Sequence, residues 1–585
     1  MNKTLRARIQ AWIDDDPDPG AASELRALLD AGAETELCRR FRAPLSFGTA
    51  GLRARGEAGL SRMNRAVMAK VAAGVCRALA SHVPRAHERG LCIGFDGRRH
   101  SRELALEATT VALGAGFVVH CFEHCVPTPV FAYAVRVLVA AGGVLLTASH
   151  NSREYSGCKI YWEGGSQLVP PWEERVAQAI DWNESVRSMP RLGRAGAKTR
   201  ALWSSQARRI EDAYLEDVTQ LLSHPRQTRA VRIAYTALHG VGQPWISRAF
   251  AEAGFNNLWC VPEQAKPDPD FSTLRVPNPE DPSTLSLALD LAREHAADLV
   301  LANDPDADRL AAAARNAEGE YAVLTGNDVG ALLADYLLEQ GPDDERRVVL
   351  STVVSSPMLG SIAARHGVHW ERTLTGFKWL AQRAQQLTAA GKRVVFAFEE
   401  ALGYMASGLA WEKDGISAAL LLAELADACK SRGQTLLDRM QQLQAEHGVF
   451  ATAQLTVPVP GENAEECAAG IFAELRRARF STLAGFEVKA LIDVEAGVRR
   501  ERGGAQTPLP LPRSPLIIVE LSRRNRVIVR PSGTEPKLKV YLEVHQLVDA
   551  HSVQRTQAEA KQTLADMGAQ VGAWLDRVRD SYDAG

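Results

Sequence analysis

The chain has 585 residues, of which 46% are hydrophobic and 24% are charged. This is the ordinary composition of a protein that buries large cores, and it excludes a mainly disordered or fibrous chain. The 68 Lys and Arg residues nearly balance the 70 Asp and Glu residues, which argues against a general polyanion binder and predicts no nucleic-acid partner. At about 150 residues per domain, the length predicts about four domains.

The sequence gives no sign of membrane insertion or secretion. No segment reaches the roughly 18 consecutive apolar residues of a membrane span, and the N-terminal segment lacks the apolar core of a secretory signal. Nine cysteines are scattered along the chain, which predicts reduced thiols and a cytoplasmic location. Cys121 and Cys125, with His120 and His124, have the spacing of metal ligands. Because a β-rich run turns alternate side chains to opposite faces, we favour a strand and a loop over a zinc site.

Helical and β-branched segments alternate along most of the chain. A helical segment with Leu25, Leu28 and Leu29 on one face comes first. Short apolar runs then predict strands at 91–95, 143–146, 231–235, 299–301, 347–350 and 393–396. Repeated alternation of this kind predicts α/β layers, with helices packed on mostly parallel strands.

The last part of the chain has a different pattern. We expect strands at 456–460, 516–521, 526–530 and 538–543, and a helix from about residue 553. This α+β pattern indicates a domain of another kind at the end of the chain. The Arg-, Gly- and Pro-rich segment 499–513 predicts an exposed, mobile loop.

The segment Thr147-Ala148-Ser149-His150-Asn151 directly follows a predicted strand. A serine there stands where α/β sheets place their ligands, and Lys159 offers a cation a short loop away. Taken alone, the segment favours a turn serine that caps a helix. A serine hydrolase ranks lower, because no Gly-x-Ser-x-Gly motif surrounds Ser149.

Three aspartates, Asp304, Asp306 and Asp308, follow the strand predicted at 299–301. In extended backbone these carboxylates would point to one side, where their repulsion requires a cation. Oxygen-only ligands suit Mg²⁺ or Ca²⁺ rather than zinc, and Arg309 in place of the required glycine excludes an EF-hand. A solvated acidic turn is the alternative, but the apolar strand that leads into three spaced aspartates favours the metal.

Two further segments offer polar groups at strand ends. The Glu399 carboxylate could accept hydrogen bonds from two neighbouring sugar hydroxyls, although Glu399-Glu400 is also typical of a helix N-terminus. In Arg530-Pro531-Ser532-Gly533-Thr534, the guanidinium, hydroxyls and backbone N–H groups could hold a phosphate. A Pro/Gly hairpin turn explains that segment equally well.

In this order, the four segments resemble the α-D-phosphohexomutase superfamily, and the resemblance covers nearly the whole chain. Lesser matches lie at 47–53, 94–98, 375–378 and 413–415. The length and the segments 235–240 and 267–271 are most similar to the long phosphoglucomutase/phosphopentomutase branch.

The resemblance implies an α/β fold class: three similar α/β domains with mixed sheets, plus a C-terminal α+β domain, around a central cleft. We expect the serine loop in domain 1–205, the metal loop in domain 206–325, the sugar-binding loop in domain 326–450 and the phosphate-binding loop in domain 451–585. Each domain would contribute one loop to the cleft.

The resemblance also implies a phosphosugar mutase. Phosphorylated Ser149 would donate its phosphoryl group to a hexose monophosphate, and the bisphosphate would turn over and return its other phosphate. We expect interconversion of α-D-glucose 1-phosphate and glucose 6-phosphate, with Mg²⁺ and glucose 1,6-bisphosphate as cofactors. Small sugar phosphates are the expected partners of a chain that is a monomer or a weak homodimer.

Residue roles follow from the same resemblance. The implied metal ligands are Ser149, Asp304, Asp306 and Asp308. Ser149, Lys159 and Arg53 are the implied catalytic residues, with the roles of Lys159 and Arg53 in proton transfer and charge stabilisation not separable. The implied substrate-binding residues are Arg309, Thr375, Gly376, Glu399, Lys413, Arg530, Ser532, Gly533 and Thr534.

Two departures from the family pattern leave alternatives open. Ala401 replaces a serine of many relatives, so a pentose mutase, a phosphomannomutase or a glucose 1,6-bisphosphate synthase stays possible. Ser152 replaces a proline, which makes the turn behind Ser149 less rigid. In another class, a metal-dependent phosphatase would use an aspartate of 304–306 as nucleophile. A non-catalytic sugar-phosphate sensor is disfavoured, because every expected catalytic position is filled.

Overall fold

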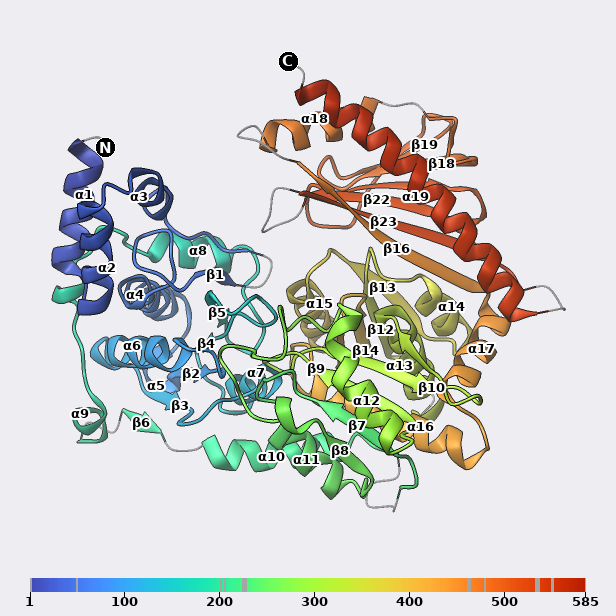
Figure 1. The fold of residues 1–585 in the computed structure, drawn as a ribbon, viewed down its shortest axis with the longest axis horizontal. Helices are drawn as coiled ribbons and strands as arrows, with labels where there is room; N and C mark the ends of the chain where they lie inside the picture. Colours follow the sequence, from blue (N-terminus) through green and yellow to red (C-terminus); the bar gives the residue numbers. More distant parts are fainter. Residues whose placement is uncertain are drawn as a thin grey trace. The chain divides into compact units, whose positions relative to one another are not determined.

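The structure, a computed structural model, describes residues 3–48, 51–199, 202–204, 207–223, 229–342, 344–459, 464–477, 480–531, 537–548 and 552–583. The chain divides into two compact units, one of residues 1–329 with 376–435 and one of residues 330–375 with 436–585. Figure 1 traces the elements of both. Within the described ranges, none of the helices combines the length and apolar character that crossing a membrane requires. None of the nine cysteines, all of which lie in the described ranges, forms a disulfide.

The first unit begins with three helices that precede the first sheet. They are α1 (Lys3–Asp15), α2 (Pro19–Asp30) and α3 (Glu34–Arg40). Asp18 caps α2 by accepting a hydrogen bond from the Gly20 N–H at 2.8 Å. Leu25, on the predicted leucine face, is fully buried in a small apolar cluster with Ile9 and Phe41.

The first sheet is mixed and has the strand order β1-β5-β4-β2-β3-β6. Its strands are β1 (Leu52–Arg55), β2 (Leu91–Phe95), β3 (Val119–Cys121), β4 (Gly142–Leu146), β5 (Tyr155–Tyr161) and β6 (Trp203–Ser204). Its helices are α4 (Arg65–His82), α5 (Ala86–Arg89), α6 (Ser101–Gly114), α7 (Thr128–Val137), α8 (Trp172–Ala179) and α9 (Arg194–Thr199). The parallel neighbours β2 and β4 place Phe95 beside Leu146, so the loops that follow them begin at one sheet edge.

Helices pack closely on this sheet. Residues of α4 and α6 share one large core with β2 and β4, and Figure 1 shows both helices beside this sheet. α7 approaches the strands at Gly143, where an added Cβ would lie 2.8 Å from the Phe131 ring. Glycine in β4 therefore allows a contact that a larger residue would prevent.

The second sheet has the order β11-β10-β9-β7-β8. Its strands are β7 (Ile233–Thr236), β8 (Leu258–Cys260), β9 (Leu299–Asn303), β10 (Leu310–Arg315) and β11 (Tyr321–Leu324), and its helices are α10 (Ala207–Thr219), α11 (Gln243–Glu252) and α12 (Ser286–Glu294). Every residue of β9 is buried, as expected for a strand with neighbours on both sides. The loop 304–309 joins β9 to its antiparallel partner β10.

The first unit is completed by α15 (Phe377–Ala389), β14 (Arg393–Glu399), β15 (Gly403–Ala406) and α16 (Gly415–Ser431). β14 and β15 pair antiparallel, so the segment between Glu399 and Gly403 is a tight connection. Asp414 caps α16 by accepting from the N–H groups of Ile416 and Ser417, each at 3.0 Å. The cap fixes the residue directly after Lys413. Helix α13 (Gly326–Gln340) spans the point at which the chain passes between the units.

The second unit contains a parallel pair of strands and a C-terminal sheet. The pair is β12 (Arg347–Thr352) with β13 (His369–Thr373), joined through α14 (Met358–Arg365). The C-terminal strands are β16 (Val449–Pro458), β17 (Thr482–Leu483), β18 (Phe486–Asp493), β19 (Val498–Glu501), β20 (Gln506–Pro508), β21 (Ile517–Leu521), β22 (Arg526–Pro531) and β23 (Lys537–Gln546). The accompanying helices are α17 (Leu436–His447), α18 (Ala464–Arg477) and α19 (Val553–Asp583), and α19 lies along β16 and β23 (Figure 1).

One prediction about this unit is wrong in part. The segment 499–513, predicted as a loop, contains most of β19 and all of β20, which form an antiparallel hairpin. A strand between two others can hold the charged side chains of this segment because they have partners: Arg499 of β19, which lies between β18 and β20, donates to Glu520 at 2.6 Å and to Glu501 at 2.7 Å. The other predicted strands are confirmed, although β16 begins earlier, at Val449, and residue 460 lies outside the described residues.

Candidate active site

Ser149 lies in a buried turn after β4, with only 1% of its surface exposed. Its φ of +49° is in the left-handed region, which a residue with a Cβ rarely adopts. The Ser149 N–H donates to Thr147 Oγ1 at 2.9 Å. Its hydroxyl donates to Asp304 Oδ2 at 2.8 Å and lies 3.1 Å from His150 Nδ1. The turn therefore aims the hydroxyl at the acidic loop of the second sheet.

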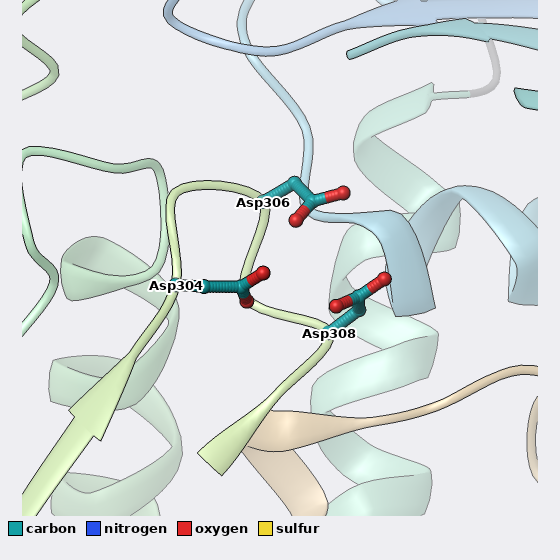
Figure 2. A group of neighbouring side chains, drawn as sticks. All are labelled: Asp304, Asp306 and Asp308. Carbon is teal, nitrogen blue, oxygen red and sulfur yellow. The ribbon is translucent and has the colours of Figure 1, made fainter. Parts of the chain in front are cut away.

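The three aspartates converge, as predicted, but not for the reason predicted. Figure 2 shows the carboxylates of Asp304, Asp306 and Asp308 around one point, and their ligand oxygens lie within 4.8 Å of one another. The expectation of extended backbone is wrong: the Ala307 N–H donates to the Asp304 carbonyl at 2.8 Å, and Ala307 has a φ of +56°. The loop lies between the end of β9 and the start of β10, and its tight turn brings the three carboxylates together.

Lys159 supplies the positive charge nearest to this cluster. Its Nζ donates to Asp306 Oδ2 at 2.7 Å and to Asp308 Oδ2 at 2.5 Å, and Lys413 Nζ lies 3.2 Å from the same Asp308 oxygen. Burial by itself raises the pKa of Asp308, but the two ammonium groups hold that pKa well below its usual range. Burial, together with Asp308 and Asp306, raises the pKa of Asp304 well above its usual range. The carboxylates are thus only partly compensated.

The aspartates fit a hard divalent cation. The Oδ1 atoms of Asp306 and Asp308 are buried and have no hydrogen-bond partner among the described residues. Three convergent carboxylates and a neighbouring hydroxyl are the donors that Mg²⁺ or Ca²⁺ prefers. Within the described ranges, no other group of His, Cys, Asp and Glu side chains has a comparable arrangement. Within those ranges, Cys121, Cys125 and their neighbouring histidines do not form such a group.

Arg53 and Arg309 lie close to the serine loop and the acidic loop. Arg53, on β1, donates from Nη1 to Asn151 Oδ1 at 2.6 Å. Arg309, directly after the aspartates, donates from its backbone N–H to Asp304 Oδ1 at 3.1 Å and from its side chain to Glu280 at 2.9 Å. Both side chains thus bring a guanidinium to the surroundings of Ser149.

Glu399 lies at the end of β14, as predicted. Burial and the neighbouring Glu400 raise its pKa to about 7, against the opposing effect of Lys413. Lys413 also binds Glu412, whose other carboxylate oxygen accepts from Tyr161 at 3.0 Å. Lys413 therefore stands between Glu399, Glu412 and Asp308.

The remaining predicted substrate-binding residues are divided between the two units, and some lie outside the described residues. Gly376, with a φ of +99°, immediately precedes α15 in the first unit. Thr375 and Arg530 belong to the second unit, where Arg530 donates to the Tyr541 hydroxyl at 3.2 Å. Ser532, Gly533 and Thr534 lie outside the described residues.

Sequence reasoning gave no role to several residues that hold the site. Thr128 donates to Asp306 Oδ2 at 2.7 Å and accepts from Lys159 Nζ at 3.0 Å. Arg98 binds the serine loop through its guanidinium. Two signals could have indicated a role for Arg98: its position after a strand next to β4, and its place in the segment 94–98 that resembles the family. Nothing in the local sequence marks Thr128.

Four family models match the chain in order. They describe phosphoglucomutase/phosphomannomutase α/β/α domain I at residues 44–187, domain II at 212–319, domain III at 325–446 and the C-terminal domain at 487–562. Each of the four predicted chemical segments falls within one of these matches.

Three curated relatives are similar over most of their length. Mouse phosphopentomutase is 35% identical over 93% of this chain and 91% of its own. Phosphoribomutase of Saccharomyces cerevisiae is 34% identical over 92% of both chains, and human glucose 1,6-bisphosphate synthase is 32% identical over 92% and 90%. The fold is that of a solved Paramecium structure, the exocytosis-sensitive phosphoprotein pp63/parafusin, with a TM-score of 0.65, 17% identity and coverage of 92% and 96%.

Cation binding tests the arrangement of the acidic loop directly. Because the Lys159 ammonium sits on two of the aspartates, replacing it with Met should strengthen Mn²⁺ binding by about tenfold or more. Asp308→Asn should weaken binding at least about 100-fold. Isothermal titration with Mn²⁺ measures both changes.

Lys430→Met is the matched control, because Lys430 pairs with Asp298 instead of the three aspartates. Its Mn²⁺ affinity should stay within about twofold of the parent value, since the removed charge lies elsewhere. Unchanged or weaker binding by Lys159→Met would contradict this account of the charge balance.

Proposed function

Because the chain belongs to the phosphoglucomutase/phosphomannomutase family, and so is a phosphotransferase isomerase of the α-D-phosphohexomutase superfamily, we propose that Ser149 moves a phosphoryl group between two oxygens of one sugar. The observation that carries the proposal is the Ser149 hydroxyl, buried and 2.8 Å from the first of three convergent aspartates. The four domains are proposed at 1–205, 206–325, 326–450 and 451–585, a division that the four family-model spans support.

The proposed cycle begins with phosphorylated Ser149. A sugar monophosphate offers its free hydroxyl to the phosphorus, the bond from phosphorus to Ser149 Oγ breaks, and a sugar bisphosphate forms. After this bisphosphate turns over, its other phosphoryl group returns to Ser149, and the isomeric monophosphate leaves. The two transfers balance, so Ser149 ends each cycle phosphorylated.

Named side chains would support the transfers. Asp304, Asp306, Asp308 and a Ser149 phosphate oxygen would hold Mg²⁺, which supplies neutralisation of charge on the transferring group. Lys159 and Arg53 would share proton exchange with the sugar hydroxyl and charge stabilisation, and Arg309 would orient the reacting phosphate. Glu399 and Lys413 would bind sugar hydroxyls. Roles for Thr375, Gly376, Arg530, Ser532, Gly533 and Thr534 in substrate binding remain predictions, as do the monomeric or weakly dimeric state and the cytoplasmic location.

We propose a pentose 1-phosphate as the preferred substrate, with α-D-glucose 1-phosphate second. Two of the three relatives described above are named for pentose or ribose phosphates, and the third makes glucose 1,6-bisphosphate by its name. Ala401, beside Glu399 and Glu400, removes a hydroxyl from the proposed sugar loop. A site with one fewer polar group loses discrimination in favour of the larger hexose.

Phosphorylation of Ser149 tests the mutase proposal. After incubation with glucose 1,6-bisphosphate, intact-mass spectrometry should show a species about 80 Da heavier, mapped by peptide sequencing to Ser149. Ser149→Ala should lose both this species and nearly all turnover, whereas Ser152→Ala, in the same loop, should keep both. A Ser149→Ala enzyme that still released phosphate from sugar phosphates would favour the metal-dependent phosphatase.

A panel of sugar 1-phosphates tests the substrate. The value of kcat/KM for ribose or deoxyribose 1-phosphate should exceed that for glucose 1-phosphate by at least about tenfold, a difference of about 1.4 kcal/mol in the transition state. Ala401→Ser should narrow this ratio by restoring a hydroxyl. A ratio below one would return glucose to first place.

The pKa of Glu399 predicts how pH affects sugar binding. A carboxyl group whose pKa is raised to about 7 is ionised above that pH and neutral below it. Because the ionised form is the better acceptor for sugar hydroxyls, KM should rise as pH falls from 8 to 6. In Glu399→Gln, the part of the rise in KM that comes from protonation of Glu399 should disappear. Only the titration of the substrate phosphate, at about pH 6, should remain in the pH profile of KM. An unchanged pH profile in Glu399→Gln would contradict the assignment.

A further inference from the structure

Arg98 is a buried arginine next to the serine loop that neither the mechanism nor the family motif has given a task. Its side chain is 2% exposed, and it follows β2 at the sheet edge where the serine loop follows β4. Asp96 lies 3.5 Å from its Nε and balances its charge. A buried guanidinium retains its charge and needs acceptors for its donors.

Those acceptors are backbone carbonyls of one short segment. Arg98 Nη2 donates to the carbonyls of Ser149, at 2.6 Å, and Asn151. Its Nη1 donates to the carbonyls of Ser152, at 3.0 Å, and Tyr155, at 3.1 Å. One rigid, planar group thus fixes four carbonyls of the segment 149–155, which a lysine with a single nitrogen could not do.

The first of these bonds acts on the reactive serine itself. Ser149 is left-handed, and its N–H is held by Thr147 Oγ1 while its carbonyl is held by Arg98. A left-handed residue with a side chain persists only where the surroundings hold it on both sides. Because the peptide groups on both sides of Ser149 are fixed, the direction of its Cα–Cβ bond is fixed as well. The Ser149 hydroxyl then points to Asp304 and donates a hydrogen bond to it.

A residue between β8 and β9 of the second sheet covers Arg98. The Phe271 ring centre lies 5.0 Å from Arg98 Cζ, a cation–π contact. Phe271 is itself left-handed, at a φ of +49°, and Asp268 braces its loop by accepting from the N–H groups of Asp270 and Ser272 at 2.9 and 3.0 Å. The loop approaches so closely that a Cβ on Gly97 would lie 2.6 Å from Pro267 Cβ.

We propose that Arg98, held under Phe271, is a positioning residue that sets the orientation of the Ser149 hydroxyl toward the acidic loop. It acts through the serine-loop backbone and touches no substrate. Phe271 precedes β9 of the second sheet, the strand that leads into the aspartates, and its ring lies on Arg98. The orientation of the Ser149 hydroxyl therefore depends on how this part of the chain contacts Arg98. The inference rests on the proposed function, in which Ser149 carries the phosphoryl group.

The test measures phosphoryl transfer to Ser149 in the full-length protein. Arg98→Lys keeps the charge but loses the fork, and Arg99→Ala is the matched control, because the neighbouring Arg99 is exposed and pairs with Asp270. Intact-mass spectrometry gives the rate at which glucose 1,6-bisphosphate phosphorylates each variant, and steady-state assays give kcat and KM.

Arg98→Lys should lower both the phosphorylation rate and kcat by about 100-fold, the expected effect of a misplacement of about 1 Å. KM should change by less than about threefold, because the substrate is not touched. Added guanidinium should restore part of the rate to Arg98→Ala, and Arg99→Ala should keep the wild-type rate with or without it. If Arg98 had only a structural role, its variants would lose thermal stability. They would show neither the fall in kcat at a nearly constant KM nor the recovery of the rate with added guanidinium.

Distinct results overturn the inference and its premise. If wild type and Arg99→Ala are phosphorylated on Ser149 but Arg98→Lys stays within about threefold of wild type, the positioning role is refuted. If wild type is never phosphorylated on Ser149, the proposed function itself fails. Should Arg98→Lys not fold, Phe271→Leu decides, since it leaves the four carbonyl bonds intact: a rate about tenfold lower supports the inference, and an unchanged rate contradicts it.

Discussion

The centre of the first unit depends on compensation of buried negative charge. Asp304 and Asp306 are fully buried and Asp308 is nearly so, and such carboxylates are stable only when cations and hydrogen bonds compensate them. Lys159 comes from β5 and Lys413 from the segment before α16. Because the aspartates and their two cations come from three separate parts of the chain, the charge balance also determines which loops must lie together.

Backbone strain accompanies that charge. Ser149, Ala307 and Leu402 are left-handed residues with side chains, one in the serine loop, one in the acidic loop and one between β14 and β15. Backbone bonds hold the acidic loop and the β14–β15 connection: the Leu310 N–H donates to the Leu402 carbonyl at 3.0 Å, and the Gly415 N–H to the Ala307 carbonyl at 3.2 Å. The serine loop meets the acidic loop through the Ser149 hydroxyl. Strained turns persist where their surroundings hold them, so the loops stabilise one another.

The sequence predicted those parts of the site that are local in the chain. Ser149, the three aspartates and Glu399 each stand in one short motif after an apolar strand, and strand ends place ligands. The roles of Thr128 and Arg98 depend on contacts with residues 178 and 51 positions away, which no local pattern encodes. The hairpin of β19 and β20 was missed for a different reason: its pairing is local, but the Arg, Gly and Pro residues of 499–513 are also typical of a loop.

Selectivity among sugars must therefore be sought away from the reacting phosphate. The serine, the aspartates and Lys159 contact one another and, in the proposed cycle, a phosphoryl group common to every sugar phosphate. Relatives with about one-third identity bear names for pentose, ribose and glucose phosphates. The same charge arrangement would serve each of these, because it recognises no sugar carbon. Discrimination then falls to groups such as Glu399 and position 401, where one hydroxyl more or less changes which substrate leaves a buried polar group unpaired.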